Sequence, residues 1–175
     1  MTHVVVLGAG LGGVIMAYEV REKLKRADRV TVINKGSQFS FVPSNPWVAV
    51  GWRKREDINV DLVPALAARD IKLEPQGAKR VHPMENRVEL IDGAFVDYDY
   101  LIIATGPELA FDEIEGLGPS AHTHSICHVD HALKAFEGFQ KLVANPGPVV
   151  IGAAQGASCF GPAYEFVFVL DNIDT

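Results

Sequence analysis

Two glycine-rich turns and two cysteines carry the residues of this sequence that could perform chemistry. The first turn, Gly8-Ala9-Gly10-Leu11-Gly12-Gly13, has the spacing G-x-G-x-x-G and follows the apolar run His3–Leu7. In such a turn Gly8 permits a tight bend, Gly10 lets a pyrophosphate approach the backbone, and Gly13 lets the following helix pack closely on the strand. The N-terminus of that helix offers free N–H groups and a positive dipole end to phosphate. The pattern predicts a dinucleotide-binding turn.

The end of the second predicted strand, residues 29–33, departs from the usual dinucleotide pattern. An acidic residue normally follows this strand and binds the ribose hydroxyls, but Asn34 and Lys35 stand there in this sequence. Asn34 can hydrogen-bond to a ribose, yet it lacks the charge that discriminates NAD from NADP. The departure weakens the prediction of an NAD site and is compatible with FAD held by other contacts.

The second glycine turn lies in the segment VVIGAAQGASCFG, residues 149–161. Its middle glycine is replaced by Ala154, whose Cβ obstructs the approach of a pyrophosphate. Cys159 is expected in the first turn of the next helix, where the helix dipole lowers the pKa of a thiol and favours the thiolate. The residues alone leave a reactive thiolate and a buried, inert cysteine equally open.

Composition excludes several classes of protein. The 175 residues suffice for one domain or one and a fraction, and the net charge of −6 without a broad basic stripe argues against a nucleic-acid partner. Cys127 and Cys159 form neither a CxxC pair nor a zinc pattern, so we expect no metal site. Reduced thiols are favoured over a structural disulfide, which stays open. No signal peptide and no membrane-spanning run are expected.

Alternating strand and helix patterns predict an α/β fold. The strand at 3–7, a helix to about Lys25 and the strand at 29–33 form a βαβ unit of the usual length. A buried strand over 98–104 ends in Ala104-Thr105-Gly106, at the carboxyl edge of a parallel sheet where ligands bind. The other predicted elements are a proline-punctuated loop at 39–52, a helix at 57–69 interrupted near Pro64, short strands at 71–74, 78–82 and 87–91, a helix at 130–143, a short β-branched strand leading into the second turn, and a helix to about Leu170.

This combination of an N-terminal G-x-G-x-x-G turn, a β-meander, an Ala-Thr-Gly strand and a second glycine turn resembles the flavoproteins with two dinucleotide-binding domains. Four segments resemble sulfide:quinone oxidoreductases in particular: FVPSNPW at 41–47, SIC at 125–127, VDH at 129–131 and GASCFGPAYE at 156–165. The similarity runs through essentially the whole chain and covers about the first two-fifths of a family member. It implies a Rossmann-like FAD-binding domain with a parallel sheet and a β-meander crossover over 1–110, a connection and helix over 111–146, and the incomplete beginning of a second Rossmann-like domain over 147–175.

The resemblance implies FAD as the cofactor. The residues that it assigns to FAD are Gly8, Gly10, Gly12 and Gly13 at the pyrophosphate, Asn34 and Lys35 near the adenosine ribose, Ala78 near the adenine through its backbone, Pro43 beside the flavin, and Thr105 and Gly106 closing over the cofactor.

The resemblance also assigns the reacting groups. Cys159 is one of two redox cysteines that capture sulfide sulfur, and Cys127 matches a third cysteine beside the flavin, covalently tied to it in some members. His131 matches the family pattern and is expected to transfer protons, with a surface or helix-capping histidine as the alternative. The electrons pass through FAD to a quinone.

Further partners follow from the same resemblance. They are sulfide, a quinone, a membrane surface contacted through a C-terminal part absent here, the remainder of the protein as another chain, and a second copy in a homo-oligomer. The protein is expected to be peripheral to a membrane of unspecified face, and this stretch alone to be inactive. Three alternatives stay open: the flavoprotein subunit of a flavocytochrome-type sulfide dehydrogenase, an NADH:quinone-type reductase, against which Ala154 argues, and a non-catalytic flavin-binding module.

Overall fold

The computed structural model describes residues 1–157 and 159–173, which form two compact units. The first unit contains Met1–Ser40 and Asn59–Glu108, and the second contains Phe41–Ile58 with the residues from Leu109 onward. Each unit has its own buried cluster of apolar side chains.

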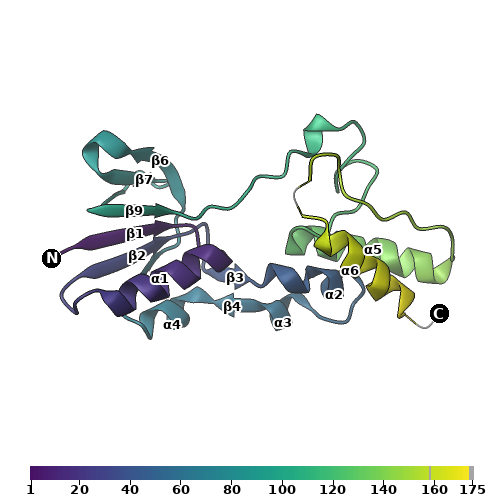
Figure 1. Ribbon diagram of the computed structural model, residues 1–175, viewed down its shortest axis with the longest axis horizontal. Coiled ribbons are helices and arrows are strands. Elements are labelled where there is room, and N and C mark those ends of the chain that lie inside the picture. The colour runs from purple at the N-terminus through teal and green to yellow at the C-terminus, as the bar shows by residue number, and fades with distance from the viewer. Residues whose placement is uncertain (158, 174–175) are drawn as a thin grey trace. The chain divides into compact units, whose positions relative to one another are not determined.

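The first unit is built on a four-stranded parallel sheet with the strand order β5-β2-β1-β9 (Figure 1). The strands are β1 (His3–Leu7), β2 (Arg29–Ile33), β5 (Lys72–Glu74) and β9 (Tyr100–Ile103). All five residues of β1 are buried, because a central parallel strand is covered on both faces and is therefore continuously apolar. This arrangement confirms the predicted α/β fold with a parallel sheet.

The two faces of this sheet have different coverings. The helices α1 (Leu11–Lys23) and α4 (Leu62–Ala67) contribute to the cluster that contains Val6. On the other side Val5 packs in the cluster formed with an antiparallel meander of β6 (Ala78–His82), β7 (Arg87–Leu90) and β8 (Phe95–Asp97). A short 3-10 helix, η2 (Pro83–Glu85), joins β6 to β7. Successive side chains of a strand point to opposite faces, so the alternation along β1 supplies both cores.

The segment predicted as an interrupted helix at 57–69 differs in the structure. It contains the end of α3 (Arg55–Ile58), then β4 (Asn59–Asp61), which pairs antiparallel with β3 (Gln38–Ser40), and then α4. Asp61 caps α4 by accepting a hydrogen bond from the backbone N–H of Val63 at 2.9 Å. Pro64 lies in the first turn of α4, where a missing N–H costs nothing, so the predicted interruption at proline was wrong.

The second unit contains α3, the helices α2 (Asn45–Ala49), α5 (Val129–Ala144) and α6 (Gly161–Asp171), and the 3-10 helices η1 (Val42–Ser44) and η3 (Phe111–Glu113). The predicted loop at 39–52 thus overlaps the end of β3 and contains η1 and α2. Helices α2 and α5 pack through Val48, Ala49 and Ala132. Gly51 has φ +78°, and a Cβ there would lie 2.5 Å from the Phe136 ring, so this close approach requires glycine.

The strand predicted before the second glycine turn does not form. Residues 148–151 have no regular structure, and Val150 is 96% exposed. Their β-branched composition suits a strand, but a strand exists only by pairing its backbone with a neighbour, and the described part of the chain provides none here.

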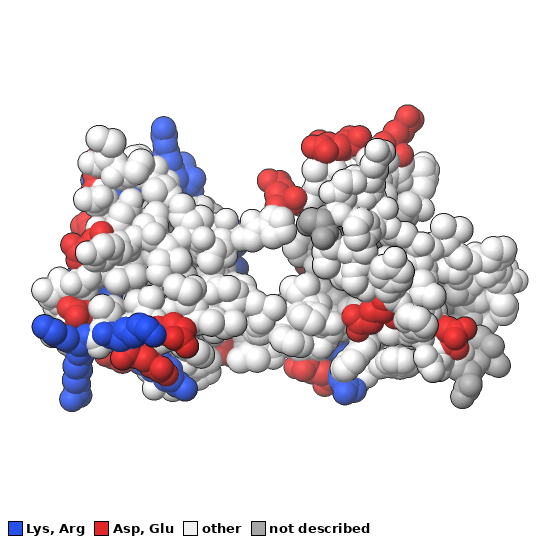
Figure 2. Space-filling view, viewed as in Figure 1, with Lys and Arg blue, Asp and Glu red and all other residues white. Residues whose placement is uncertain are grey.

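Charged side chains of both signs lie side by side on the surface. Figure 2 shows basic groups among acidic ones over the first unit, and the sequence as a whole has a net charge of −6. Within residues 1–157 and 159–173, no helix is both long enough and apolar enough to cross a membrane.

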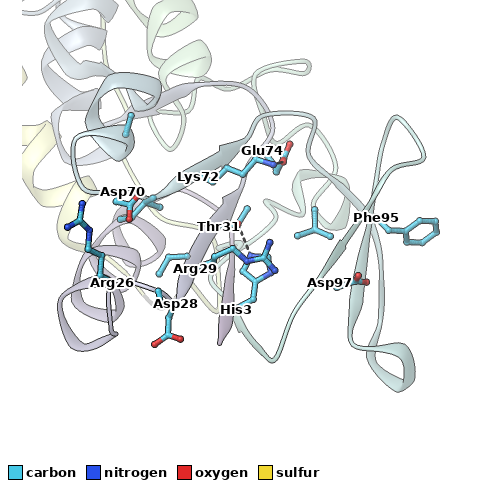
Figure 3. A pocket seen from close by; sticks show the side chains of 15 residues that line it. His3, Arg26, Asp28, Arg29, Thr31, Asp70, Lys72, Glu74, Phe95 and Asp97 are labelled. Carbon is cyan, nitrogen blue, oxygen red and sulfur yellow. Dashed lines mark hydrogen bonds and ion pairs between the residues drawn. The ribbon is translucent and has the colours of Figure 1, made fainter. Parts of the chain in front are cut away.

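His3 at the start of β1 is the one buried histidine, at 9% exposure, of the described residues (Figure 3). Its Nε2 shares a hydrogen bond of 2.8 Å with Oγ1 of the buried Thr31 on β2. Burial, followed by the positive charge of Arg29, lowers the pKa of His3 below its ordinary value of 6.5, and a hydrogen bond to the Asp97 backbone only partly opposes this. The folded protein therefore holds His3 neutral at neutral pH.

We expect this histidine to make the protein less stable in acid. The unfolded chain protonates His3 at its ordinary pKa and the folded chain only at lower pH, so stability falls as the pH drops through 6.5. The check is the urea midpoint between pH 7.5 and pH 5 for the wild type and for His3→Gln, which cannot titrate. Identical pH slopes for the two proteins would contradict the assignment.

Candidate nucleotide-binding site

The glycine turn between β1 and α1 is fixed by backbone contacts to the two neighbouring strands. Gly8 has φ +99°, and a Cβ there would lie 2.3 Å from the carbonyl oxygen of Ala104, directly after β9. The N–H of Gly8 donates to the carbonyl of Ile33 at 2.8 Å, at the end of β2. The turn is thus held at the carboxyl ends of β1, β2 and β9, the edge at which open α/β sheets bind ligands.

Of the remaining glycines of the turn, one is packed against the backbone and two have open space around them. A Cβ at Gly13 would lie 2.0 Å from the carbonyl oxygen of Gly8, so α1 can pack on the turn only with glycine at this position. Nothing lies within 4 Å of a Cβ built at Gly10 or at Gly12. Gly10 is the N-cap residue of α1 and has no side-chain cap. The bare backbone beside the helix N-terminus therefore fits a pyrophosphate.

The ends of the neighbouring strands bring further predicted residues to this turn. Asn34 follows β2, and its Oδ1 accepts a hydrogen bond from the N–H of Ala9 at 3.1 Å. Thr105 follows β9, and its Cα lies 3.0 Å from the Cβ position of Gly8. Gly106 has φ +73° and open space around its Cβ position. The structure thus brings together, at one sheet edge, residues that are separated by up to about a hundred positions in the sequence.

Two other predicted cofactor residues of the first unit lie near this edge. Lys35 is exposed and forms an isolated antiparallel bridge with Gln76. Ala78 begins β6 and packs partly buried on the cluster that contains Val5 and Leu7. Its side chain is thus part of the core, which leaves its backbone as the group available to a ligand.

The predicted reacting residues and Pro43 belong to the second unit. Pro43 lies in η1 and is exposed. Cys127 lies two residues before α5, is exposed, and donates its N–H to Oγ of Ser125 at 3.2 Å. Cys159 is also exposed, and α6 begins only at Gly161. The expected position of Cys159 inside the first helical turn was therefore wrong, because the glycine-rich segment extends two residues further. Both thiols are free, which leaves no structural disulfide between them.

His131 lies in the first turn of α5 next to a second imidazole. Its ring and that of His128 are edge to face with centroids 5.2 Å apart, and Nδ1 of His131 is buried without a hydrogen-bond partner. Burial, followed by the charge of His128, lowers the pKa of His131, with Asp130 opposing. A neutral imidazole at pH 7 can accept a proton. The i, i+3 spacing of the two histidines at a helix start is the sequence signal for this pair.

Two polar features of the second unit escaped the sequence reasoning. Asn45, inside the FVPSNPW segment, is fully buried, and both of its amide atoms lack a partner. Arg55 of α3 forms an ion pair with Asp130 of α5, and the hydrogen bond from Arg55 holds the pKa of Asp130 below its usual value. These two residues are 75 positions apart, so no local pattern could have linked them.

A depression of the first unit lies away from the glycine turn, beside the first residues of three strands of the sheet. It measures about 660 Å³ and lies at His3, Arg29 and Lys72, the first residues of β1, β2 and β5 (Figure 3). Its charged lining residues are of both signs: Arg26, Arg29, Lys72, Asp28, Asp70, Glu74 and Asp97. Because ligands of such sheets bind at the carboxyl ends of the strands, we place the site at the glycine turn. No three or more ligating side chains of residues 1–157 and 159–173 are grouped to hold a metal ion.

A pair of glycine substitutions separates the two roles within the turn. Gly13→Ala should destabilise the protein by about 2 kcal/mol or more, because its Cβ overlaps the Gly8 carbonyl. Gly12→Ala, one position earlier in α1, should be neutral or stabilising by up to about 1 kcal/mol because alanine favours a helix. Urea unfolding of both variants checks this, and equal stabilities would show that the turn does not require the close contact.

Sulfide:quinone oxidoreductases are among the known proteins that this chain resembles in sequence. The chain is 45% identical over 168 residues to the sulfide-quinone reductase of Aquifex aeolicus, which covers 96% of this chain and 38% of that protein. It is 28% identical to the mitochondrial sulfide:quinone oxidoreductase of Dictyostelium discoideum, over 98% of this chain and 38% of that protein. The chain therefore spans about two-fifths of the length of these relatives.

Solved structures agree in fold. The X-ray structure of the sulfide:quinone oxidoreductase from Aquifex aeolicus matches with a TM-score of 0.88 and 44% identity, over 97% of this chain and 39% of that one. The NDH2 structure from Plasmodium falciparum in complex with NADH matches with a TM-score of 0.63 at 21% identity, over 82% of this chain and 30% of that one, and shows the fold alone. These matches confirm the predicted resemblance. The family model for pyridine nucleotide-disulphide oxidoreductases covers residues 2–157, so this chain belongs to the pyridine nucleotide-disulphide oxidoreductase family.

Proposed function

We propose that this chain forms the FAD-binding part of a sulfide:quinone oxidoreductase. The observation that carries the proposal is the 45% identity with the Aquifex aeolicus sulfide-quinone reductase over 96% of the chain. The glycine turn supports it, because the open backbone at Gly10 and Gly12 fits a pyrophosphate. FAD, when bound, supplies a two-electron acceptor for sulfide and a donor for a quinone.

The residues of the chain would bind FAD from several sides. Gly8, Gly10, Gly12 and Gly13 would hold the pyrophosphate, with Thr105 and Gly106 closing over it. Asn34 and Lys35 would lie near the adenosine ribose, Ala78 near the adenine and Pro43 near the flavin. We propose the boundaries 1–110 for the FAD-binding part, 111–146 for the connection and helix, and 147–175 for the start of a second dinucleotide-type domain.

The free thiols would carry the sulfur chemistry. Oxidation of HS⁻ to zero-valent sulfur releases two electrons and one proton; bound FAD would accept the two electrons, and a cysteine sulfur would hold the oxidised sulfur as a persulfide. Cys159 would be one of two redox cysteines, and Cys127 would lie beside the flavin; both are exposed. His131 would accept the proton, since its lowered pKa keeps it neutral at pH 7.

The exposed face of α6 supports a further polypeptide partner. Phe160, Tyr164, Val167 and Phe168 are exposed and follow one another at the i, i+4, i+7 and i+8 spacing of a single helix face. Val169 is buried and Phe166 packs on the cluster of α2 and α5, so α6 is apolar on both sides. We propose that polypeptide equivalent to the part of the relatives outside the 38% match covers this face. Quinone binding, peripheral attachment to a membrane and homo-oligomer formation would belong to the same assembly.

The proposed activity has a direct spectroscopic test. In the FAD-loaded assembly, sulfide should bleach the flavin absorbance, a quinone should restore it, and NADH should have no effect, because Ala154 obstructs the second turn. Cys159→Ser should slow the bleaching by more than about a hundredfold, because it removes the sulfur atom that would hold the oxidised sulfide sulfur. Met84→Leu, which removes an exposed sulfur elsewhere, should not. Bleaching by NADH and not by sulfide would refute the proposal and indicate a reductase that oxidises NADH.

Complementation tests the partner of α6. Phe168→Glu places a charge on the exposed stripe and should change the stability of the chain by less than about 0.5 kcal/mol, as exposed substitutions do. It should lower the binding of a polypeptide spanning the unmatched part of the Aquifex aeolicus relative by more than about tenfold, measured by co-purification. The exposed Glu165→Gln, outside the stripe, is the control. Equal binding of all three proteins would place the partner elsewhere.

A further inference from the structure

We propose that the nucleotide site accepts an adenosine nucleotide with a phosphate on its ribose as well as one with free ribose hydroxyls. This inference rests on the proposed function, which places adenosine at the end of β2. Three observations carry it: the hydrogen bonds of the Asn34 amide, the ion pair of Glu74, and the free cation of Lys35. The first two show that a group that would repel a ribose phosphate is missing or neutralised, and the third supplies a positive charge that would bind it.

The side chain of Asn34 is occupied by the backbone of the turn. Its Oδ1 accepts from the N–H of Ala9 at 3.1 Å, and its Nδ2 donates to the carbonyl of Gly36 at 3.1 Å. Exchanging the two amide atoms would set donor against donor and acceptor against acceptor, so this orientation is fixed. The amide therefore fastens the loop after β2 to the glycine turn. Asn34 is a positioning residue of the turn and does not select between ribose groups.

The acidic residue next to this position is neutralised by an ion pair. Glu74, on the adjacent strand β5, accepts the backbone N–H of Asn34 through its carbonyl at 3.0 Å. Its carboxylate pairs with Lys72 at 2.6 Å, and the Glu74 side chain is only 20% exposed. In dinucleotide sites a free carboxylate at the end of the second strand binds the ribose hydroxyls and repels a phosphate. The Glu74 carboxylate is therefore bound to a cation and lines the depression beside His3 and Arg29, so it does not take the place of the missing ribose ligand.

Lys35 supplies a positive charge at the same place. It directly follows Asn34, its side chain is exposed, and its backbone is held by the bridge to Gln76. The N–H of Gly36 donates to the carbonyl of Pro75 at 2.8 Å, which fixes the other side of Lys35. Salt bridges within the described residues use Lys23, Lys72 and Lys79 but not Lys35, so its ammonium is free to bind a phosphate.

Competition with FAD measures the selectivity of this site. FAD is titrated into the FAD-free assembly of the chain with the polypeptide proposed to cover α6, with its fluorescence quenching as the signal, in the presence of ADP or of ADP that carries a 2′-phosphate. For the wild type we expect inhibition constants of the two competitors that agree within about threefold. Asn34→Asp should bind the phosphorylated competitor at least about tenfold more weakly than ADP, because the new carboxylate repels the phosphate.

Two lysine substitutions distinguish the effect of the charge at Lys35 from the effect of lowering the net charge of the protein. Lys35→Gln should weaken the phosphorylated competitor about tenfold relative to ADP. Lys25→Gln makes the same charge change just beyond α1 and should leave the wild-type ratio unchanged. Using the ratio of the two competitors removes any general loss of affinity that a variant causes.

Each result decides the inference. Rejection of the phosphorylated competitor by tenfold or more in the wild type, an unchanged ratio in Lys35→Gln, or failure of ADP to compete with FAD would overturn it. None of these outcomes affects the sulfide test: a flavin that sulfide bleaches would keep the proposed activity while the inference on ribose selectivity falls. A flavin that sulfide leaves oxidised would refute the activity even where the two competitors bind alike.

Discussion

The first unit depends on a backbone contact that is too close for any side chain. The carbonyl of Gly8 lies where a Cβ at Gly13 would be, and the carbonyl of Ala104 lies where a Cβ at Gly8 would be. These contacts hold α1, β1 and the end of β9 at one point. They also leave the backbone of Gly10 and Gly12 open on the other side. The tight packing of the turn and its capacity to bind phosphate are therefore two results of the same geometry.

The alternation of β1 extends this arrangement into the core. Val6 faces the helices and Val5 faces the meander, so one short strand anchors both layers. Hydrogen bonds from Gly8 to β2 and from Ala104 to Leu7 then fix the carboxyl ends of three strands relative to one another. Asn34 completes the edge by joining the loop after β2 to Ala9. The polar groups at this edge thus fix the geometry of the site through hydrogen bonds within the protein, independently of any ligand.

The second unit shows a different balance. Helices α2 and α5 have a buried interface with each other, whereas α6 has apolar side chains on a buried and on an exposed face. The free thiols and the pair of histidines all lie in this unit. Helices α2 and α5 bury their apolar side chains against each other, whereas α6 leaves apolar side chains exposed where the proposed further polypeptide would bind. The chemistry proposed for the chain therefore depends on the second unit, which exposes the apolar face of α6.

The sequence by itself determined the parallel sheet, the meander and the glycine turn. Apolar periodicity and glycine spacing are read from neighbouring residues, and at these positions the burial of apolar side chains and the backbone freedom of glycine outweigh other interactions. It also pointed to both cysteines and to His131 through their resemblance to known segments. The tertiary structure decided what local signals cannot contain. The β-branched run at 148–151 forms no strand because pairing needs a neighbour, and Pro64 lies within the first turn of the helix that Asp61 caps. The ion pair of Arg55 with Asp130 and the link from Asn34 to Ala9 join residues distant in sequence, and only folding brings them within hydrogen-bonding distance.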